Sequence, residues 1–110
     1  MNSSIHIDVI LDQDRIPESI SWSATELAGD KAQEAKGMLL SFFDKESKDT
    51  LKIDLWTKDM QVMEMDRFFY QTLRALADTY QRATSNAKLA DAMQQFAKYF
   101  GEQVELIKKD

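Results

Sequence analysis

Short stretches in the N-terminal half of the chain alternate apolar with polar residues, which is the pattern of half-buried strands. Leu51, Ile53 and Leu55, for example, alternate with Lys52 and Asp54. The pattern predicts strands over four ranges: residues 4–11, 20–24, 36–44 and 51–56. The third range carries large apolar residues on both faces, so we expect it to be central in the sheet or covered on both sides.

The C-terminal half changes to helical spacing, with apolar residues recurring every three or four positions. The first set is Val62, Met65, Phe69, Leu73, Leu76 and Tyr80. The second set is Leu89, Met93, Phe96, Phe100, Val104 and Ile107. These stripes predict helices at about residues 60–83 and 87–108, with Phe69 in the core. Thr57 or Asp59 is expected to cap the first helix.

Strands followed by helices indicate an α+β fold. The expected architecture is an antiparallel sheet of three to four strands followed by a C-terminal antiparallel two-helix hairpin, because only a few residues separate the helices. A chain of 110 residues with 44% hydrophobic content suits a single domain over residues 1–110. Residues 25–34 are small and polar and predict a mobile loop between strands.

The net charge of −5 lies entirely in residues 1–34, which hold seven acidic and two basic residues. An acidic balance argues against nucleic acid and anionic membranes as main partners. Two interpretations stay open: a solvated segment that keeps the protein soluble, or a docking surface for a basic protein partner. The residues considered for docking are Asp12, Asp14 and Glu18.

Aromatic residues also occur beside the stripe of the first predicted helix. Phe68 and Tyr70 lie about a third of a turn to either side of it, at 100° per residue. They pack within the fold, or together with Tyr99 they form an oligomer or partner interface. A homo-oligomer is therefore one expectation.

Residues that carry chemistry are few. The chain has no Cys and one histidine, His6, so a thiolate or histidine-rich metal site is not expected. Asp12 and Asp14 open like a calcium loop, but Ile16 and Pro17 stand where that loop needs an oxygen ligand and a glycine. We expect no catalytic, cofactor-binding or metal-binding residues. A minor hypothesis pairs Asp8 and Asp54 as an acid–base couple on neighbouring strands.

The N-terminus lacks the basic region and apolar run of a secretory signal. No apolar stretch approaches the roughly 20 residues that a membrane span needs. The cytoplasm is therefore the expected location, without direct membrane insertion.

Several segments, distributed in order along most of the chain, together resemble one known family. They are Ile5–Val9, Leu11-Asp12, Pro17, Ile20–Ala24, Ile53–Met60, Glu64-Met65, Phe68-Phe69, Gln71–Leu73, Ala77–Thr79 and Ala83-Thr84. In these segments the chain resembles the gliding-motility protein GldC family of the Bacteroidota. One departure is Gln61, where the family pattern has a proline at the start of the helix.

The resemblance implies a non-enzymatic accessory protein of surface gliding that acts by protein–protein interaction, with a partner whose identity the sequence does not give. An alternative is a small holding chaperone for exported proteins, because strands followed by two C-terminal helices are similar in outline to the export chaperone SecB.

Overall fold

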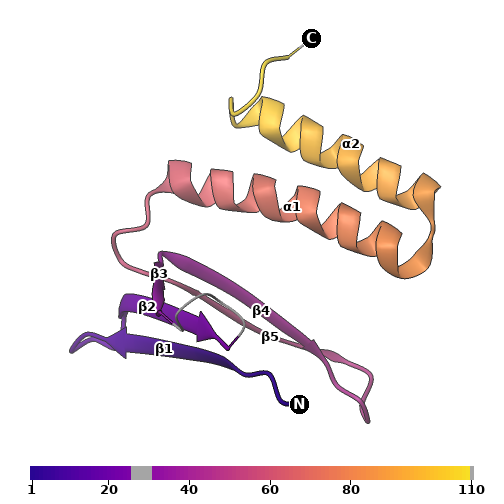
Figure 1. Cartoon of the computed structure of the whole chain (residues 1–110). Helices are drawn as coiled ribbons and strands as arrows, with labels where there is room; N and C mark the ends of the chain where they lie inside the picture. The colour runs from indigo at the N-terminus through magenta and orange to yellow at the C-terminus, as the bar shows by residue number, and fades with distance from the viewer. Residues whose placement is uncertain (26–30, 110) are drawn as a thin grey trace. The chain divides into compact units, whose positions relative to one another are not determined.

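A computed structural model describes residues 1–25 and 31–109 of the chain (Figure 1). The chain forms two compact units, Met1–Met60 and Gln61–Asp110. The first contains five strands: β1 Ile5–Leu11, β2 Pro17–Ala24, β3 Gln33–Ala35, β4 Gly37–Phe43 and β5 Thr50–Trp56. The second contains two helices: α1 Val62–Thr84 and α2 Ala87–Gln103. The predicted α+β class, with antiparallel strands followed by two helices, is confirmed. That both units form one domain stays a prediction.

The side chain of Asp12 stabilises the turn between β1 and β2. Its Oδ1 accepts hydrogen bonds from the backbone N–H groups of Asp14 (2.8 Å) and Ile16 (3.0 Å), while Arg15 takes a left-handed conformation with φ of 65°. β2 begins at Pro17, three residues before the predicted start. The antiparallel register places Val9 opposite Ile20, and Ile20 is almost completely buried.

The strand β3 was not predicted. It pairs with β2 so that Ala35 lies opposite Ile20, which completes a three-stranded sheet in the order β1-β2-β3. The loop predicted over residues 25–34 is wrong at residues 33 and 34, because pairing with β2 organises a segment whose own residues are mostly polar. The middle of that predicted loop, residues 26–30, lies outside the described residues.

Strands β4 and β5 form a separate two-stranded sheet. Their turn is held by Asp44, whose Oδ2 accepts a hydrogen bond from the Ser47 backbone N–H at 2.8 Å, and Lys48 is left-handed with φ of 60°. Within the described part of the chain, β4 pairs with β5 and no other strand, and Phe42 and Phe43 are exposed. The expectation that residues 36–44 form a central or doubly covered strand is therefore wrong.

The polar residues that follow β5 form hydrogen bonds within Met1–Met60 and do not cap α1. Thr57 is buried; its backbone N–H donates to the Lys36 carbonyl oxygen at 2.8 Å, and its hydroxyl donates to the Asp59 carboxylate. The N-cap of α1 is Gln61, whose backbone N–H donates to Glu64 Oε1 at 3.0 Å. The predicted caps, Thr57 and Asp59, are wrong, and α1 begins two residues later than predicted.

The two helices pack antiparallel, as predicted. Gln94 Nε2 on α2 donates to Asp78 Oδ1 (3.1 Å) and to the Arg74 carbonyl oxygen (3.3 Å) on α1, while Gly101, further along α2, meets Tyr70, which is earlier in α1. The residues buried along this seam are small: Ala77, Ala90, Ala97 and Gly101.

The end of α2 differs from the prediction. The helix stops at Gln103 and not near residue 108, because Glu105 takes a left-handed conformation with φ of 63°. The backbone N–H groups of Leu106 and Ile107 then turn back to the Gly101 carbonyl oxygen, at 2.9 and 3.3 Å.

Candidate interaction surfaces

The apolar stripe predicted for the first helix does not form the helix–helix seam. Phe69 is 41% exposed, and Val62, one heptad before it, and Leu76, one heptad after it, are more exposed still. Tyr70 and Ala77 face α2. Phe69 and Leu76 are the residues immediately before them in the sequence. One residue is a 100° rotation about the helix axis, so the stripe lies beside the seam and not in it.

The second helix repeats this arrangement. Leu89 and Phe96 are exposed, and each precedes a buried seam residue, Ala90 or Ala97. In an antiparallel pair the second helix runs in the opposite direction, and its seam residues point in the opposite direction, back towards the first helix. These two reversals cancel, so the residue before a seam residue points to the same side of the pair on both helices. These apolar residues therefore share one side, which we call the helix face: Val62, Phe69, Leu76, Leu89 and Phe96.

The three aromatic residues predicted as partner-binding residues have different environments. Tyr99 is exposed, and its ring lies 6.3 Å from that of Phe96, so it extends the helix face. Phe68 is half-buried and meets Phe69 edge to face. Tyr70 packs on Gly101 across the seam, and the Arg74 guanidinium carbon lies 5.8 Å from its ring centroid.

A second apolar surface lies in the strand unit, on one side of β4 and β5. Directly opposed residues of an antiparallel pair point to the same side of the sheet. Three such pairs are apolar: Met38 with Leu55, Leu40 with Ile53, and Phe42 with Leu51. We call these six residues the hairpin face; none is buried, and Leu51 is 59% exposed. The alternation at residues 51–55 predicted half of this face, but only the register with β4 reveals the rest.

The acidic residues considered for docking cluster around one cation. Lys58 Nζ forms ion pairs with Asp12 Oδ2 (3.2 Å) and Glu18 Oε1 (3.3 Å), while Asp14 is exposed beside them. These four residues, with Leu11 and Gln13, line an open hollow of about 480 Å³. The sequence does not point to Lys58, because no local pattern brings residue 58 next to residue 12.

The electrostatics of this cluster follow from its hydrogen bonds. The backbone N–H of Ile16, aided by that of Asp14 and by Lys58, lowers the pKa of the Asp12 carboxyl below its ordinary value. The carboxylates of Asp12 and then Glu18 raise the pKa of Lys58. Two of the three candidate docking carboxylates thus already have a cationic partner, and Asp14 carries the charge most open to a ligand.

The hypothesis of an Asp8–Asp54 acid–base couple is wrong. Asp8 lies on β1 opposite Ser21, and Asp54 lies on β5 in the other sheet. Their neighbours are cationic or titratable groups of their own strands: His6 Nε2 lies 3.1 Å from Asp8, and Lys52 Nζ lies 3.2 Å from Asp54. Further along the acidic N-terminal third, Glu34 is exposed on β3, while Glu26 and Asp30 lie outside the described residues.

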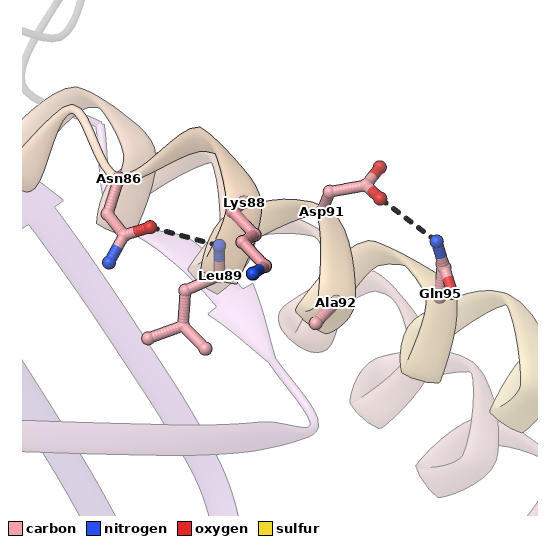
Figure 2. A pocket seen from close by; sticks show the side chains of 6 residues that line it. All are labelled: Asn86, Lys88, Leu89, Asp91, Ala92 and Gln95. Carbon is pink, nitrogen blue, oxygen red and sulfur yellow. Dashed lines mark hydrogen bonds between the residues drawn. The ribbon is translucent and has the colours of Figure 1, made fainter.

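An open hollow of about 440 Å³ lies at the start of α2 (Figure 2). Its polar side chains bond locally: Asn86 Oδ1 accepts from the Leu89 backbone N–H at 3.0 Å and caps the helix, and Gln95 Nε2 donates to Asp91 Oδ2 at 2.9 Å. These bonds serve the helix, so we assign the hollow no ligand.

The described residues hold neither a metal-binding cluster nor a membrane-spanning helix. No three His, Asp or Glu side chains in residues 1–25 and 31–109 lie close enough together to hold a metal ion. Neither α1 nor α2, the helices in that part of the chain, is long and apolar enough to cross a membrane.

Comparison with known proteins gives a family. The family model described as gliding motility-associated protein GldC-like matches residues 17–106. No curated protein and no solved structure gives a significant match. The matched residues span most of the chain and include the ion-paired Lys58, both helices and all six residues of the hairpin face. The resemblance found in the sequence is thereby confirmed, and the chain belongs to the GldC-like family of gliding motility-associated proteins.

Proposed function

We propose that this chain is a non-enzymatic, cytoplasmic accessory protein of gliding motility that acts by binding a protein of the motility machinery through the helix face. The observation that carries the proposal is the exposed apolar side of the α1–α2 pair, formed by Val62, Phe69, Leu76, Leu89 and Phe96. Membership of the GldC-like family indicates the process, which is gliding motility. The helix face is a surface through which the chain can bind another protein of that process.

The chemistry of the helix face suits a protein partner. Aromatic side chains are enriched in the cores of protein interfaces, where their large apolar area is removed from water. Phe69, Phe96 and Tyr99 provide three such side chains on one side of the pair. Helices that present an apolar side commonly pack against a groove or another helix.

The acidic N-terminal third supports a basic partner in the same proposal. Asp14 is exposed, and the cluster of Asp12, Asp14, Glu18 and Lys58 carries a net charge of −2. Such a charge accelerates the approach of a basic surface and adds little to the final affinity. Raising the salt concentration should then slow association, because the Debye length falls from ~10 Å at 0.1 M to ~3 Å at 1 M.

The proposal is tested by affinity capture from a gliding bacterium, with bound proteins quantified by mass spectrometry. The variant Phe69→Glu places a charge in the middle of the helix face. The matched control, Gln71→Glu, places the same residue on an exposed position of α1 pointing away from that face. We expect one stoichiometric partner with the parent and the control, and its recovery should fall at least tenfold with Phe69→Glu. Equal recovery with both variants would exclude the helix face.

A holding chaperone, similar in outline to SecB, is the second candidate function. The observation that favours it is that the helix face contains only aliphatic and aromatic groups, which bind unfolded segments without strong sequence preference. In the same capture experiment this function predicts many unfolded exported precursors in place of one stoichiometric protein. The parent should also suppress aggregation of a denatured model substrate, and Phe69→Glu should suppress it less.

A further inference from the structure

We infer that residues 104–108, which follow α2 and which we call the strap, have two positions. In this structure the strap folds back on Gly101. In the second position it continues α2 by about one and a half turns and lies along the start of α1. Three features of Gln61–Asp110 carry this inference: the conformation of Glu105, the hydrogen bonds around it, and the register of the two helices. The proposed function uses the helix face and is independent of the strap.

The cap at the end of α2 has a glutamate at the position where glycine is usual. The backbone N–H of Leu106 donates to the Gly101 carbonyl oxygen at 2.9 Å, and that of Glu105 donates to the Glu102 carbonyl oxygen at 3.2 Å. This pair of bonds is the Schellman motif, whose left-handed residue is most often glycine. Glu105 takes that conformation with φ of 63°, although its side chain disfavours it. The folded-back position is therefore strained at one residue.

The second position keeps the backbone hydrogen bonds of the first. In an α-helix each N–H donates to the carbonyl oxygen four residues earlier. The N–H of Glu105 would thus exchange Glu102 for Gly101, and the N–H of Leu106 would exchange Gly101 for Glu102. The N–H of Ile107 likewise keeps an acceptor. Extension of α2 therefore relieves Glu105 without leaving any of these donors unpaired, and what it gives up is the packing of Ile107 on Gly101.

The sequence of the strap suits a helix. Val104 and Ile107 continue the apolar spacing of α2, four and then three residues after Phe100. Residues 104–108 include neither glycine nor proline, the two residues that most disfavour a helix. Extension would also bring Lys108 into the last turn of α2, where a positive charge is favourable beside the carbonyl groups of the helix end.

The register of the helix pair provides a place for the extended strap. Gly101 meets Tyr70. One heptad before Gly101, Gln94 bonds to the residues at positions 74 and 78, on either side of Ala77, which is one heptad after Tyr70. The two helices therefore keep the same pairing over a whole heptad.

One heptad in the other direction, this register pairs residue 108 with Met63 on α1. The helix α2 stops at Gln103, and the strap in its second position would supply the missing length of about 7.5 Å, at 1.5 Å per residue. Met63 is 77% exposed, so the described part of Gln61–Asp110 leaves this position of the seam uncovered. The strap thus couples the start of α1 to the cap of α2, and a protein that binds Met63 would favour the folded-back position.

The first test measures the Cα chemical shifts of residues 104–108 by NMR in two variants of one residue. Glu105→Gly removes the strain of the cap and should reduce the helical population of the strap at least about fivefold, the lower limit for a left-handed residue with a side chain. Glu105→Val disfavours the left-handed conformation further and should raise that population. Ser85→Gly, at the left-handed residue that ends α1, is the control and should leave the strap unchanged. Equal shifts in both Glu105 variants, or a strap without helical shifts in Glu105→Val, overturn the inference.

The second test traps the extended position by a disulfide within one chain. The protein has no cysteine, so Met63→Cys combined with Lys108→Cys introduces a single pair of thiols. In the folded-back position the chain beyond α2 leads away from α1 (Figure 1), so bond formation under mild oxidation reports extension. The bond should form in this double variant, faster when Glu105→Val is added and slower when Glu105→Gly is added. No bond in any of the three proteins, or the same rate in all three, overturns the inference.

Discussion

The ring of Tyr70 on α1 lies directly over the backbone of Gly101 on α2. A methyl group built on Gly101 would come within 2.6 Å of Tyr70 Cε1 and 2.9 Å of Cδ1, closer than carbon atoms normally approach. The glycine is therefore the position at which the two helices can approach closely enough for the tyrosine to pack across the seam.

The first prediction concerns this contact. Gly101→Ala should destabilise the protein by about 1–3 kcal/mol, the usual cost of overpacking, although alanine is about 1 kcal/mol better than glycine inside a helix. Urea unfolding measures the change. In a Tyr70→Ala background the same substitution should cost less, because the ring that obstructs the methyl group is gone and only Ile107 Cγ1, at 3.2 Å from the methyl position, still has to shift. The same loss in both backgrounds would mean that Tyr70 is not the cause.

The second prediction compares two positions on the helices. Ala97→Leu should cost about 1–3 kcal/mol, because the seam has no room for a larger side chain. Phe69→Ala should cost less than the ~3–5 kcal/mol of an emptied core site, because the ring is 41% exposed. Thermal and urea unfolding of the two variants decide the matter. A fully core-like loss for Phe69→Ala, with a tolerated Ala97→Leu, would restore the original interpretation of the stripe.

The exposed apolar stripe and the buried small residues of the seam show which features of the helices can be predicted from the sequence and which cannot. The 3–4 spacing from Val62 to Tyr80 correctly predicted a helix, and the alternation at Leu51, Ile53 and Leu55 correctly predicted a strand. The seam was missed because alanine and glycine carry too little apolar surface to stand out, although their small size is what allows close helix packing. The stripe marked the side of α1 with most apolar surface, which is a different property from burial.

Long-range pairing explains the other misses. The strand β3, Gln33–Ala35, has no apolar alternation of its own and exists through its register with β2. The salt bridges of Lys58 join residues 40 and 46 positions apart. Folding places these groups together, and no local pattern encodes either contact.

The third prediction concerns pH. The pKa of Asp12 is lowered, so its contribution to stability is complete above the ordinary value of 3.8 and is lost as pH falls through the lowered pKa. The pKa of Lys58 is raised, so its contribution is complete below 10.5 and is lost as pH rises through the raised pKa. Stability from this cluster should thus be constant from about pH 5 to 10 and decline at both extremes.

Urea unfolding at several pH values tests this prediction. Asp12→Asn keeps an oxygen that can accept the two backbone hydrogen bonds but cannot ionise, so its acid-side decline should be shallower than that of the parent. Asp14→Asn, two residues away, is the control and should follow the parent. Identical acid-side curves for Asp12→Asn and the parent would show that Asp12 does not supply this dependence.

The fourth prediction concerns the start of α2. Asn86 Oδ1 accepts a hydrogen bond from the Leu89 backbone N–H at 3.0 Å, the geometry of an N-cap. Asn86→Ala should lower the free energy of unfolding by about 1 kcal/mol. Asn86→Asp retains an acceptor and should preserve most of the stability that the cap contributes. If both variants unfold with the parent in urea, the cap contributes no stability.

The central claim is that the helix face acts in gliding by holding a protein partner. Its most direct measurement is the gliding speed of single cells whose only copy of this protein is Phe69→Glu or Gln71→Glu, with equal amounts of both variants verified in the cell. We predict that Gln71→Glu cells glide like the parent and that Phe69→Glu cells glide like a strain without the protein. Normal gliding of Phe69→Glu cells, in a strain that stops gliding when the protein is deleted, would contradict the claim.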